Sequence, residues 1–133
     1  MTDLGTLGGA NSFATAVSGD TVVGYSDTAT AGVQDAFAYD LRTGTMIDLG
    51  TFGGNTQSTA VAVSGEIVCG YASNGNVPNH AWAYNLGTRT ATVLPTLGGP
   101  SATAIGVNQE GVIVGNAELS VGLGHAAAWT PSS

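Results

Sequence analysis

Two histidines are the first candidates for chemistry in this chain, and each begins a short run of alanine and aromatic residues. They are His80 and His125, which lie 45 positions apart and therefore at the same point of a repeated pattern. Equivalent positions predict the same local role, such as an imidazole hydrogen bond to a neighbouring loop or to a ligand. No His-x-His or His-x-x-x-His pair occurs, so the sequence predicts no metal site.

Other catalytic side chains are sparse. Cys69 lies between Val68 and Gly70 in the most apolar segment, which is typical of a buried thiol and not of a nucleophile. The acids Asp3 and Asp48 recur at the same position of two repeats and supply one carboxylate each, whereas calcium needs roughly six to eight oxygen ligands. We therefore expect no catalytic residue and no cofactor. The nine acidic residues leave a glycosidase-like hydrolase with a carboxylate pair as an alternative.

Aromatic and amide side chains point to binding instead. Tyr25 and Tyr71, with Asn74 and Asn76, lie in or beside loops that differ between repeats. Rings cover the apolar face of a sugar and amides bond its hydroxyls, so these residues are candidate carbohydrate ligands. A tyrosine at a strand end is also typical of plain packing. The variable loops, which we expect to gather on one face, are Asp27–Gln34, Ala72–Asn79 and Glu118–Gly124.

Composition limits the partners of the chain. Its 133 residues fit one domain, 1–133, and nine acids against two arginines give a net charge of −7. Such a chain cannot build the basic patch that nucleic acids or anionic membrane surfaces require. No apolar run approaches the roughly 20 residues of a membrane-spanning helix, so no membrane insertion is expected. A single cysteine excludes an intramolecular disulfide.

Three motifs return at intervals of about 45 residues, which is the signature of a repeat protein. They are Thr2–Gly9 with Ile47–Gly54 and Thr92–Gly99; Ala16–Tyr25 with Ala62–Tyr71 and Gly106–Asn116; and Asp35–Tyr39 with His80–Tyr84 and His125–Trp129. We place repeat 1 at about 12–52, repeat 2 at about 57–97 and repeat 3 at about 102–130. An N-terminal strand, 2–7, is expected to complete repeat 3.

Each repeat reads as four short strands, which gives about twelve in the chain. The third strand of repeat 2 puts His80, Trp82 and Tyr84 on one face and alanines on the other. A bulky face and a small face on each strand predict sheets that stack on one another. This order favours an all-β fold, a β-propeller of four-stranded blades, with a β-trefoil as the alternative. The mid-strand glycines, Gly24, Gly70 and Gly115, mark places where a neighbouring group comes close.

The motifs resemble the HAF repeat family of bacterial proteins. The resemblance rests on Asp35-Ala36-Phe37, His80-Ala81-Trp82 and the D-L-G-T-L-G-G segment, and it covers nearly the whole chain. It departs at Asp35, where the histidine is missing, and at Ala127, where the aromatic residue is. The resemblance implies an extracellular or cell-surface β-rich protein and carries no agreed catalytic residues. The chain itself begins without a signal-peptide pattern.

Together these observations predict a non-catalytic propeller module that binds surface carbohydrate or a protein partner. A structural or assembly repeat domain is the alternative. Three blades make too tight a ring, so we expect a homodimer in which two chains meet head to tail and close six blades, with a piece of a longer propeller as the alternative. Each chain then supplies the fourth strand that the other lacks.

Overall fold

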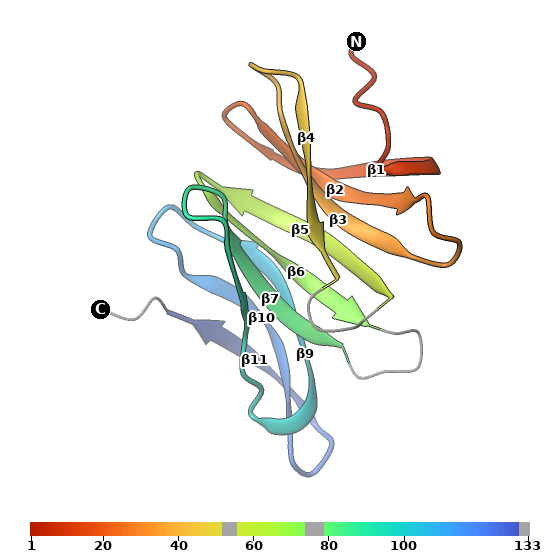
Figure 1. The fold of residues 1–133 in the computed structure, drawn as a ribbon. Helices are drawn as coiled ribbons and strands as arrows, with labels where there is room; N and C mark the ends of the chain where they lie inside the picture. Colours follow the sequence, from red (N-terminus) through yellow and green to blue (C-terminus); the bar gives the residue numbers. More distant parts are fainter. Residues whose placement is uncertain (52–55, 74–78, 131–133) are drawn as a thin grey trace.

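The computed structural model describes residues 1–51, 56–73 and 79–130, and the regular elements of this part are β-strands without any helix. Successive strands pair antiparallel in three meanders, which confirms the all-β prediction (Figure 1). Within these residues there is consequently no helix of the length and apolarity needed to span a membrane.

The first meander comprises β1 (Gly8–Ser18), β2 (Thr21–Thr28), β3 (Gln34–Asp40) and β4 (Thr45–Gly50). The second comprises β5 (Gln57–Ser64), β6 (Ile67–Ser73), β7 (His80–Asn85) and β8 (Thr90–Val93). The third comprises β9 (Gly98–Val107), β10 (Ile113–Leu119) and β11 (Gly124–Trp129). The described residues thus hold eleven strands where the sequence predicted about twelve.

The difference in number comes from the N-terminal segment. Residues 2–6 belong to no strand, and Leu7 forms only an isolated parallel bridge with Thr28. This segment lies beside the first meander, at the end of the molecule away from the third (Figure 1). Its predicted role as the fourth strand of repeat 3 therefore stays a prediction, because one chain alone does not bring the two together.

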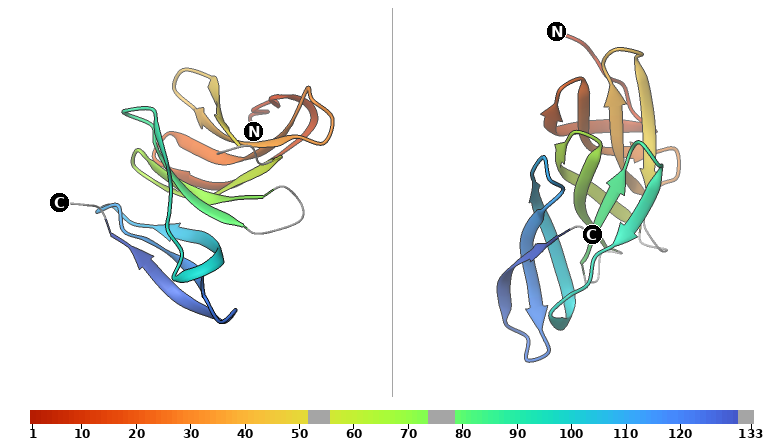
Figure 2. Two further views of the ribbon diagram at one scale, coloured as in Figure 1. Left: turned by 60° about the horizontal axis from the view of Figure 1, so that its bottom comes forward. Right: turned by 90° about the vertical axis from the view of Figure 1, so that its left-hand side faces the viewer.

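The three meanders stack in chain order, with the first meander at one end and the third at the other (Figure 2). A single parallel bridge, Gln34 to Gln57, joins the first meander to the second. The sheets do not close into a barrel. Because a barrel forms the centre of a trefoil, this open stack does not support the trefoil alternative.

Each first strand carries a β-bulge opposite a mid-strand glycine. In the second meander the register shifts between Ala60 and Ala62, and a Cβ built on Gly70 would overlap the carbonyl oxygen of Thr59. The same overlap arises at the repeat-equivalent glycines, Gly24 and Gly115. The predicted close approach is confirmed, and the approaching atom belongs to the first strand of the same meander. A bulge bends its strand and increases the local twist, so side chains other than hydrogen cannot fit here.

Each meander has two unlike faces. We call the face that points to the next meander in the chain the forward face and the opposite one the backward face. One core cluster joins Val23, Ala36 and Ala38 on the first forward face to the second backward face, which includes Val63 and Trp82. A second cluster joins the second forward face to the third backward face by the same kind of contact, through Cys69, Ala81, Ala102, Ala104, Ile113 and Ala117.

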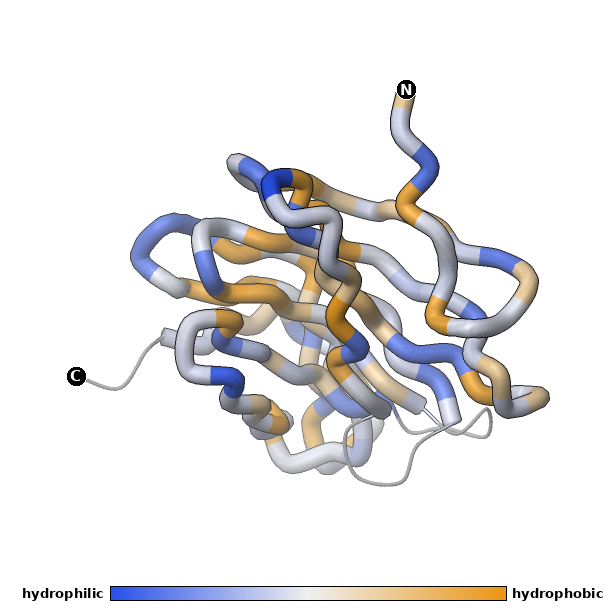
Figure 3. Tube along the Cα trace, turned by 45° about the horizontal axis from the view of Figure 1, so that its top comes forward, coloured by the Kyte–Doolittle hydropathy of each residue, from blue (hydrophilic) through white to orange (hydrophobic). Residues whose placement is uncertain are grey.

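The T-L-G-G segments lead the chain into a new meander. Their first glycine adopts a positive φ, and their second lies in close contact with a neighbouring strand. Gly8 and Gly98 adopt φ of 112° and 106°, a region that L side chains rarely enter. A Cβ on Gly9 would overlap Asp27, since β1 runs close to β2 there. The Thr6 hydroxyl donates to the Gly9 carbonyl at 2.9 Å and so holds the turn. Hydrophilic residues gather in the turns and apolar ones along the strands (Figure 3).

Candidate ligand-binding surface

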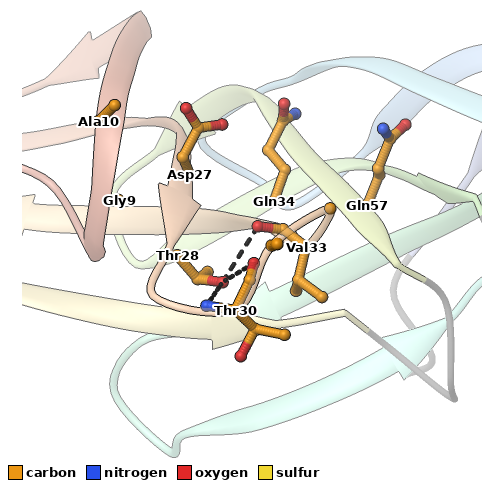
Figure 4. A pocket seen from close by; sticks show the side chains of 10 residues that line it. Gly9, Ala10, Asp27, Thr28, Thr30, Val33, Gln34 and Gln57 are labelled. Atoms are coloured by element: carbon orange, nitrogen blue, oxygen red, sulfur yellow. Dashed lines mark hydrogen bonds between the residues drawn. The ribbon is translucent and has the colours of Figure 1, made fainter.

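A hollow of about 350 Å³ lies where the first meander meets the second (Figure 4). Its polar walls come from three neighbouring strands: Asp27 from the end of β2, Gln34 from the start of β3 and Gln57 from the start of β5. Gly9 and the β2–β3 loop complete it. The hollow therefore joins residues that are up to 48 positions apart in the sequence.

Strand register lines up the three polar side chains. Asp27 is paired with Gln34 between β2 and β3, and Gln34 with Gln57 between β3 and β5. Residues directly opposite one another project to the same side of a sheet. Figure 4 shows the carboxylate and the two amides extending in the same direction. They form a row, which we call the polar row, and it continues to Ser73, the partner of Gln57 on β6.

The two amides of the polar row are available to a ligand. Neither Gln34 nor Gln57 forms a side-chain hydrogen bond to any of the residues that the structure describes. Asp27 accepts one hydrogen bond, from Asn11 Nδ2 at 3.3 Å, which leaves further acceptor capacity on its carboxylate. The row therefore offers both amide donors and oxygen acceptors to a bound molecule.

The floor of the hollow is held in shape by Thr28. Its Oγ1 accepts a hydrogen bond from the Thr30 amide at 3.2 Å and donates to the Val33 carbonyl at 3.1 Å (Figure 4). The Thr28 amide also donates to the Val33 carbonyl, at 3.1 Å. These bonds close the β2–β3 loop on itself, as hydroxyl side chains commonly do in turns. A pre-formed floor lowers the entropy that binding must lose.

Charge defines what the hollow can accept. Among the described residues that line it, only Asp27 is charged. The two arginines lie in turns at the opposite ends of the strands, where Arg42 Nε lies 3.6 Å from Asp20 and 3.7 Å from Asp40. No cation is thus placed to bind an anionic ligand at the polar row. The chemistry suits an uncharged, hydroxyl-bearing molecule.

A second hollow, of about 420 Å³, lies along the same ends of the strands where the second meander meets the third. It is lined by Asn79, Ser101, Asn116 and Glu118. Asn79 stands at the repeat position of Gln34, and Glu118 at that of Asp27. The two hollows border variable loops of the first and third repeats, so amide and carboxylate chemistry recurs along this rim of the stack.

Of the binding residues predicted from the sequence, those that the structure describes lie outside the two hollows. Tyr25 is half-buried and stacks on Phe13 with ring centroids 5.0 Å apart, and Tyr71 is half-buried on β6 opposite Thr59. His80 is half-buried at the start of β7, whereas His125 is exposed on β11. Asn74 and Asn76 lie outside the described residues. The sequence did not predict the polar row, although two of its residues, Asp27 and Gln34, are the first and last residues of a predicted variable loop.

Asp35 carries the most perturbed carboxyl group. It occupies the repeat position of His80 and is buried, and the pKa of its carboxyl rises to about 7. Burial is the main cause, followed by a hydrogen bond to Asp48 and repulsion by its charge. A hydrolase holds its two carboxyl groups about 5–9.5 Å apart around the sugar. Two carboxyl groups that hydrogen-bond to each other leave no such space, so this pair does not favour the hydrolase alternative.

Cys69 behaves as the sequence predicted. It is fully buried, and desolvation raises the pKa of its thiol to about 12. The thiol therefore stays protonated at neutral pH and is shielded from reagents. Among the residues that the structure describes, no three His, Cys, Asp or Glu side chains cluster closely enough to hold a metal ion.

Comparisons with protein-family models, with curated proteins and with solved structures find no match for this chain. The resemblance to HAF repeats therefore stays a prediction from the motifs, and the candidate surface is judged on its own geometry.

Proposed function

We propose that the chain is a non-catalytic binding module that takes neutral, hydroxyl-rich carbohydrate on the polar row. The observation that carries the proposal is the row itself: Asp27, Gln34 and Gln57 project side by side from three adjacent strands over a hollow. Strand backbones fix the spacing of these groups more firmly than loops do. Such a surface can meet several hydroxyls of one sugar without rearranging.

Tyr25 adds an apolar element to this surface. It lies two residues before Asp27 on β2, so both side chains project from the same face of the strand. The separation along the strand is about 6.6 Å, which is of the order of one sugar ring. A sugar that bonds the polar row can therefore place an apolar face toward the Tyr25–Phe13 stack.

We further propose that the meanders are propeller blades and that self-association completes the ring. The unlike faces that stack in chain order support this, as does the four-stranded pattern of the first two meanders. The extracellular or cell-surface setting implied by the HAF resemblance is compatible with a carbohydrate ligand. A protein ligand and a purely structural role are the competing outcomes of the test below.

The test is affinity electrophoresis of the purified chain in native gels that contain dextran, mannan or galactan. Retardation in at least one neutral polysaccharide is expected for the unaltered chain. The double variant Gln34→Ala/Gln57→Ala should lose the retardation, because it removes both amides and leaves the strand pairing in place.

Gln109→Ala is the matched control. Gln109 is exposed in the β9–β10 turn, at the opposite ends of the strands, so its loss should leave retardation unchanged. Circular dichroism melting curves confirm that all three proteins fold. Free migration of the unaltered chain in all three polysaccharides contradicts the carbohydrate proposal and favours the structural role. Equal retardation of all three proteins contradicts the placement on the polar row.

A further inference from the structure

The two ends of the stack are unlike and complementary. At the first end, Ala14 and Val17 on the backward face are exposed, Val17 to 62%. Their repeat equivalents in the second meander, Ala60 and Val63, are buried against the first meander at 0% and 9%. The backward face of the first meander thus carries residues of the kind that a preceding meander covers.

At the other end, the forward face of the third meander is open. Val114 is 45% exposed, and Ala126 and Ala128 are exposed beside it. The repeat equivalents of Val114 are Val23 and Cys69, both fully buried against a following meander. Among the described residues, neither of these two end faces is therefore covered by another meander. A second copy of the same chain would cover both.

The N-terminal segment meets the first meander through a contact that the end of β4 also makes with the second meander. Ser58 Oγ on β5 bonds the carbonyl of Gly50, the last residue of β4, at 2.5 Å. Ser12 Oγ on β1 bonds the carbonyl of Gly5 at 2.6 Å in the same way. Gly5 thus stands toward the first meander as Gly50 stands toward the second.

The edge that this segment needs is also present. In the first and second meanders, β3 and β7 pair on their outer sides with β4 and β8. In the third, β11 pairs with β10 alone among the described residues. An exposed strand edge accepts a further strand through its backbone groups.

We propose that two copies of this chain join head to tail, with residues 2–6 of each copy added to β11 of the other and the open forward and backward faces in contact. The register of the first meander, Phe37 opposite Asp48 and Ala38 opposite Ile47, transfers to Ala127 opposite Asp3 and Ala128 opposite Thr2. The proposal deepens the self-association put forward above and is independent of the carbohydrate site.

The charges at this joint are complementary. In the first meander Asp35 lies next to Asp48, whose charge contributes to raising the pKa of the Asp35 carboxyl group. The corresponding pair across the joint is His125 of one copy and Asp3 of the second. An imidazole beside a carboxylate attracts it where two carboxylates repel. The Asp3 carboxylate also accepts the Gly5 amide at 2.9 Å, which fixes the turn that presents the segment.

Two matched substitutions test the faces by light scattering on a sizing column. The unaltered chain should run as a dimer of twice 13.1 kDa. Val17→Glu and Val114→Arg should each give a monomer, because each introduces a charge into an apolar contact. An equimolar mixture of the two should regain a dimer, since one joint is then native and the other pairs Glu with Arg.

Val121→Glu is the control for surface charge. Val121 is 74% exposed in the β10–β11 loop, outside both faces, and this variant should stay dimeric. A monomeric unaltered chain overturns the proposal, as does a ladder of larger assemblies, since a head-to-tail contact that fails to close forms filaments. Failure of the mixed sample to dimerise overturns the assigned contact.

A disulfide tests the added strand directly. Thr2→Cys and Ala128→Cys in one chain should yield a covalent dimer after mild oxidation, while either single variant should not. Cys69 does not interfere because it is fully buried. His125→Asp should raise the dimer dissociation constant about tenfold, whereas His125→Asn should change it less. The proposed register is overturned if either single cysteine variant cross-links as well as the double variant, or if His125→Asp and His125→Asn change the dissociation constant equally.

The polysaccharide gels separate this proposal from the proposed function. The polar row lies within one chain, so monomeric Val17→Glu should still be retarded if the carbohydrate site exists. Retardation without dimerisation overturns the joint alone, and dimerisation without retardation overturns the carbohydrate site alone.

Discussion

The second meander differs from its two neighbours in environment more than in sequence. It lies between two other meanders, whereas the first and third each meet only one neighbouring meander. Val63 is 9% exposed and its equivalent Val17 is 62% exposed. Cys69 is fully buried and its equivalent Val114 is 45% exposed. All three meanders therefore carry residues suited to contact on both sides, and position in the stack decides which contacts are made.

The third meander also fills its core differently. Phe37 and Trp82 are buried at 1% and 0% at the same repeat position, where the third meander has Ala127. Trp129, two residues later, packs at the border of the second core cluster. Its Nε1 donates to the Pro95 carbonyl at 2.8 Å. Trp129 stands at the repeat position of Tyr39 and Tyr84, so this strand carries one aromatic ring in the third meander where it carries two in the others.

The largest loss of stability is expected from the tryptophan that is buried between the first two meanders. Trp82→Ala should lower the free energy of unfolding by about 4 kcal/mol, because it removes the largest fully buried side chain and leaves a cavity between the first two meanders. Trp129→Ala should cost about half as much, since that ring is only half-buried. Urea titrations followed by circular dichroism measure both. Equal losses would mean that the third meander is as tightly packed as the second.

A smaller loss is expected from the bulge of the second meander. Gly70→Ala should cost about 3 kcal/mol, because its Cβ would collide with a backbone carbonyl that cannot move independently. Gly124→Ala is the matched control: no atom lies within 4 Å of a Cβ built there. That variant should melt within about 2 °C of the unaltered chain. A benign Gly70→Ala would show that the bulge is not needed to hold the strand.

The repeated pattern made much of the fold predictable. Alternation of large and small residues in His80–Tyr84 indicated strands with two unlike faces, and the core clusters confirm that such faces meet. Mid-strand glycines such as Gly70 correctly indicated a close approach. The number of strands was less predictable, because a strand needs a partner. Residues 2–6 carry a strand-like sequence but meet no edge within their own chain.

The candidate site was harder to predict because register creates it. Gln34 and Gln57 become neighbours only through one bridge between two meanders. The local sequence around either residue does not predict that bridge. The tyrosines and histidines are candidate binding residues by residue type alone. Type alone does not tell whether a ring such as Tyr25 stacks on a neighbour or faces a hollow. Asp27 and Gln34 were visible only as the ends of a variable loop.

Two valines at the same repeat position, Val63 and Val17, lie on a covered face and on an open face respectively. Val63→Ala should cost about 2 kcal/mol, since it removes two buried methyl groups, while Val17→Ala should stay within about 0.5 kcal/mol in dilute solution. Unfolding curves at low and high protein concentration distinguish two cases. If a second copy covers Val17, the cost of Val17→Ala grows with concentration and that of Val63→Ala does not. Costs that are equal at low concentration would contradict the open first face.

The subtlest difference between the meanders lies at the position occupied by Asp35 in the first and His80 in the second. The folded pKa of Asp35, about 7, exceeds the unfolded value of 3.8. Between these values the unfolded chain releases the proton first, so stability is highest below the unfolded pKa and falls as pH rises to the folded pKa. Above pH 7 both states are ionised and this contribution becomes constant.

Asp35→Asn removes the titration and keeps a group that can donate to Asp48. The variant should match the unaltered chain near pH 4, become progressively the more stable of the two up to about pH 7, and keep a constant advantage above it. Gln57→Ala, which removes no titratable group from the polar row, is the control and should show no such divergence. If the stability of Asp35→Asn and that of the unaltered chain depend on pH in the same way, the pKa of Asp35 is not raised in the folded chain. That result would also remove the contrast between an acid pair in the first meander and a histidine in the second.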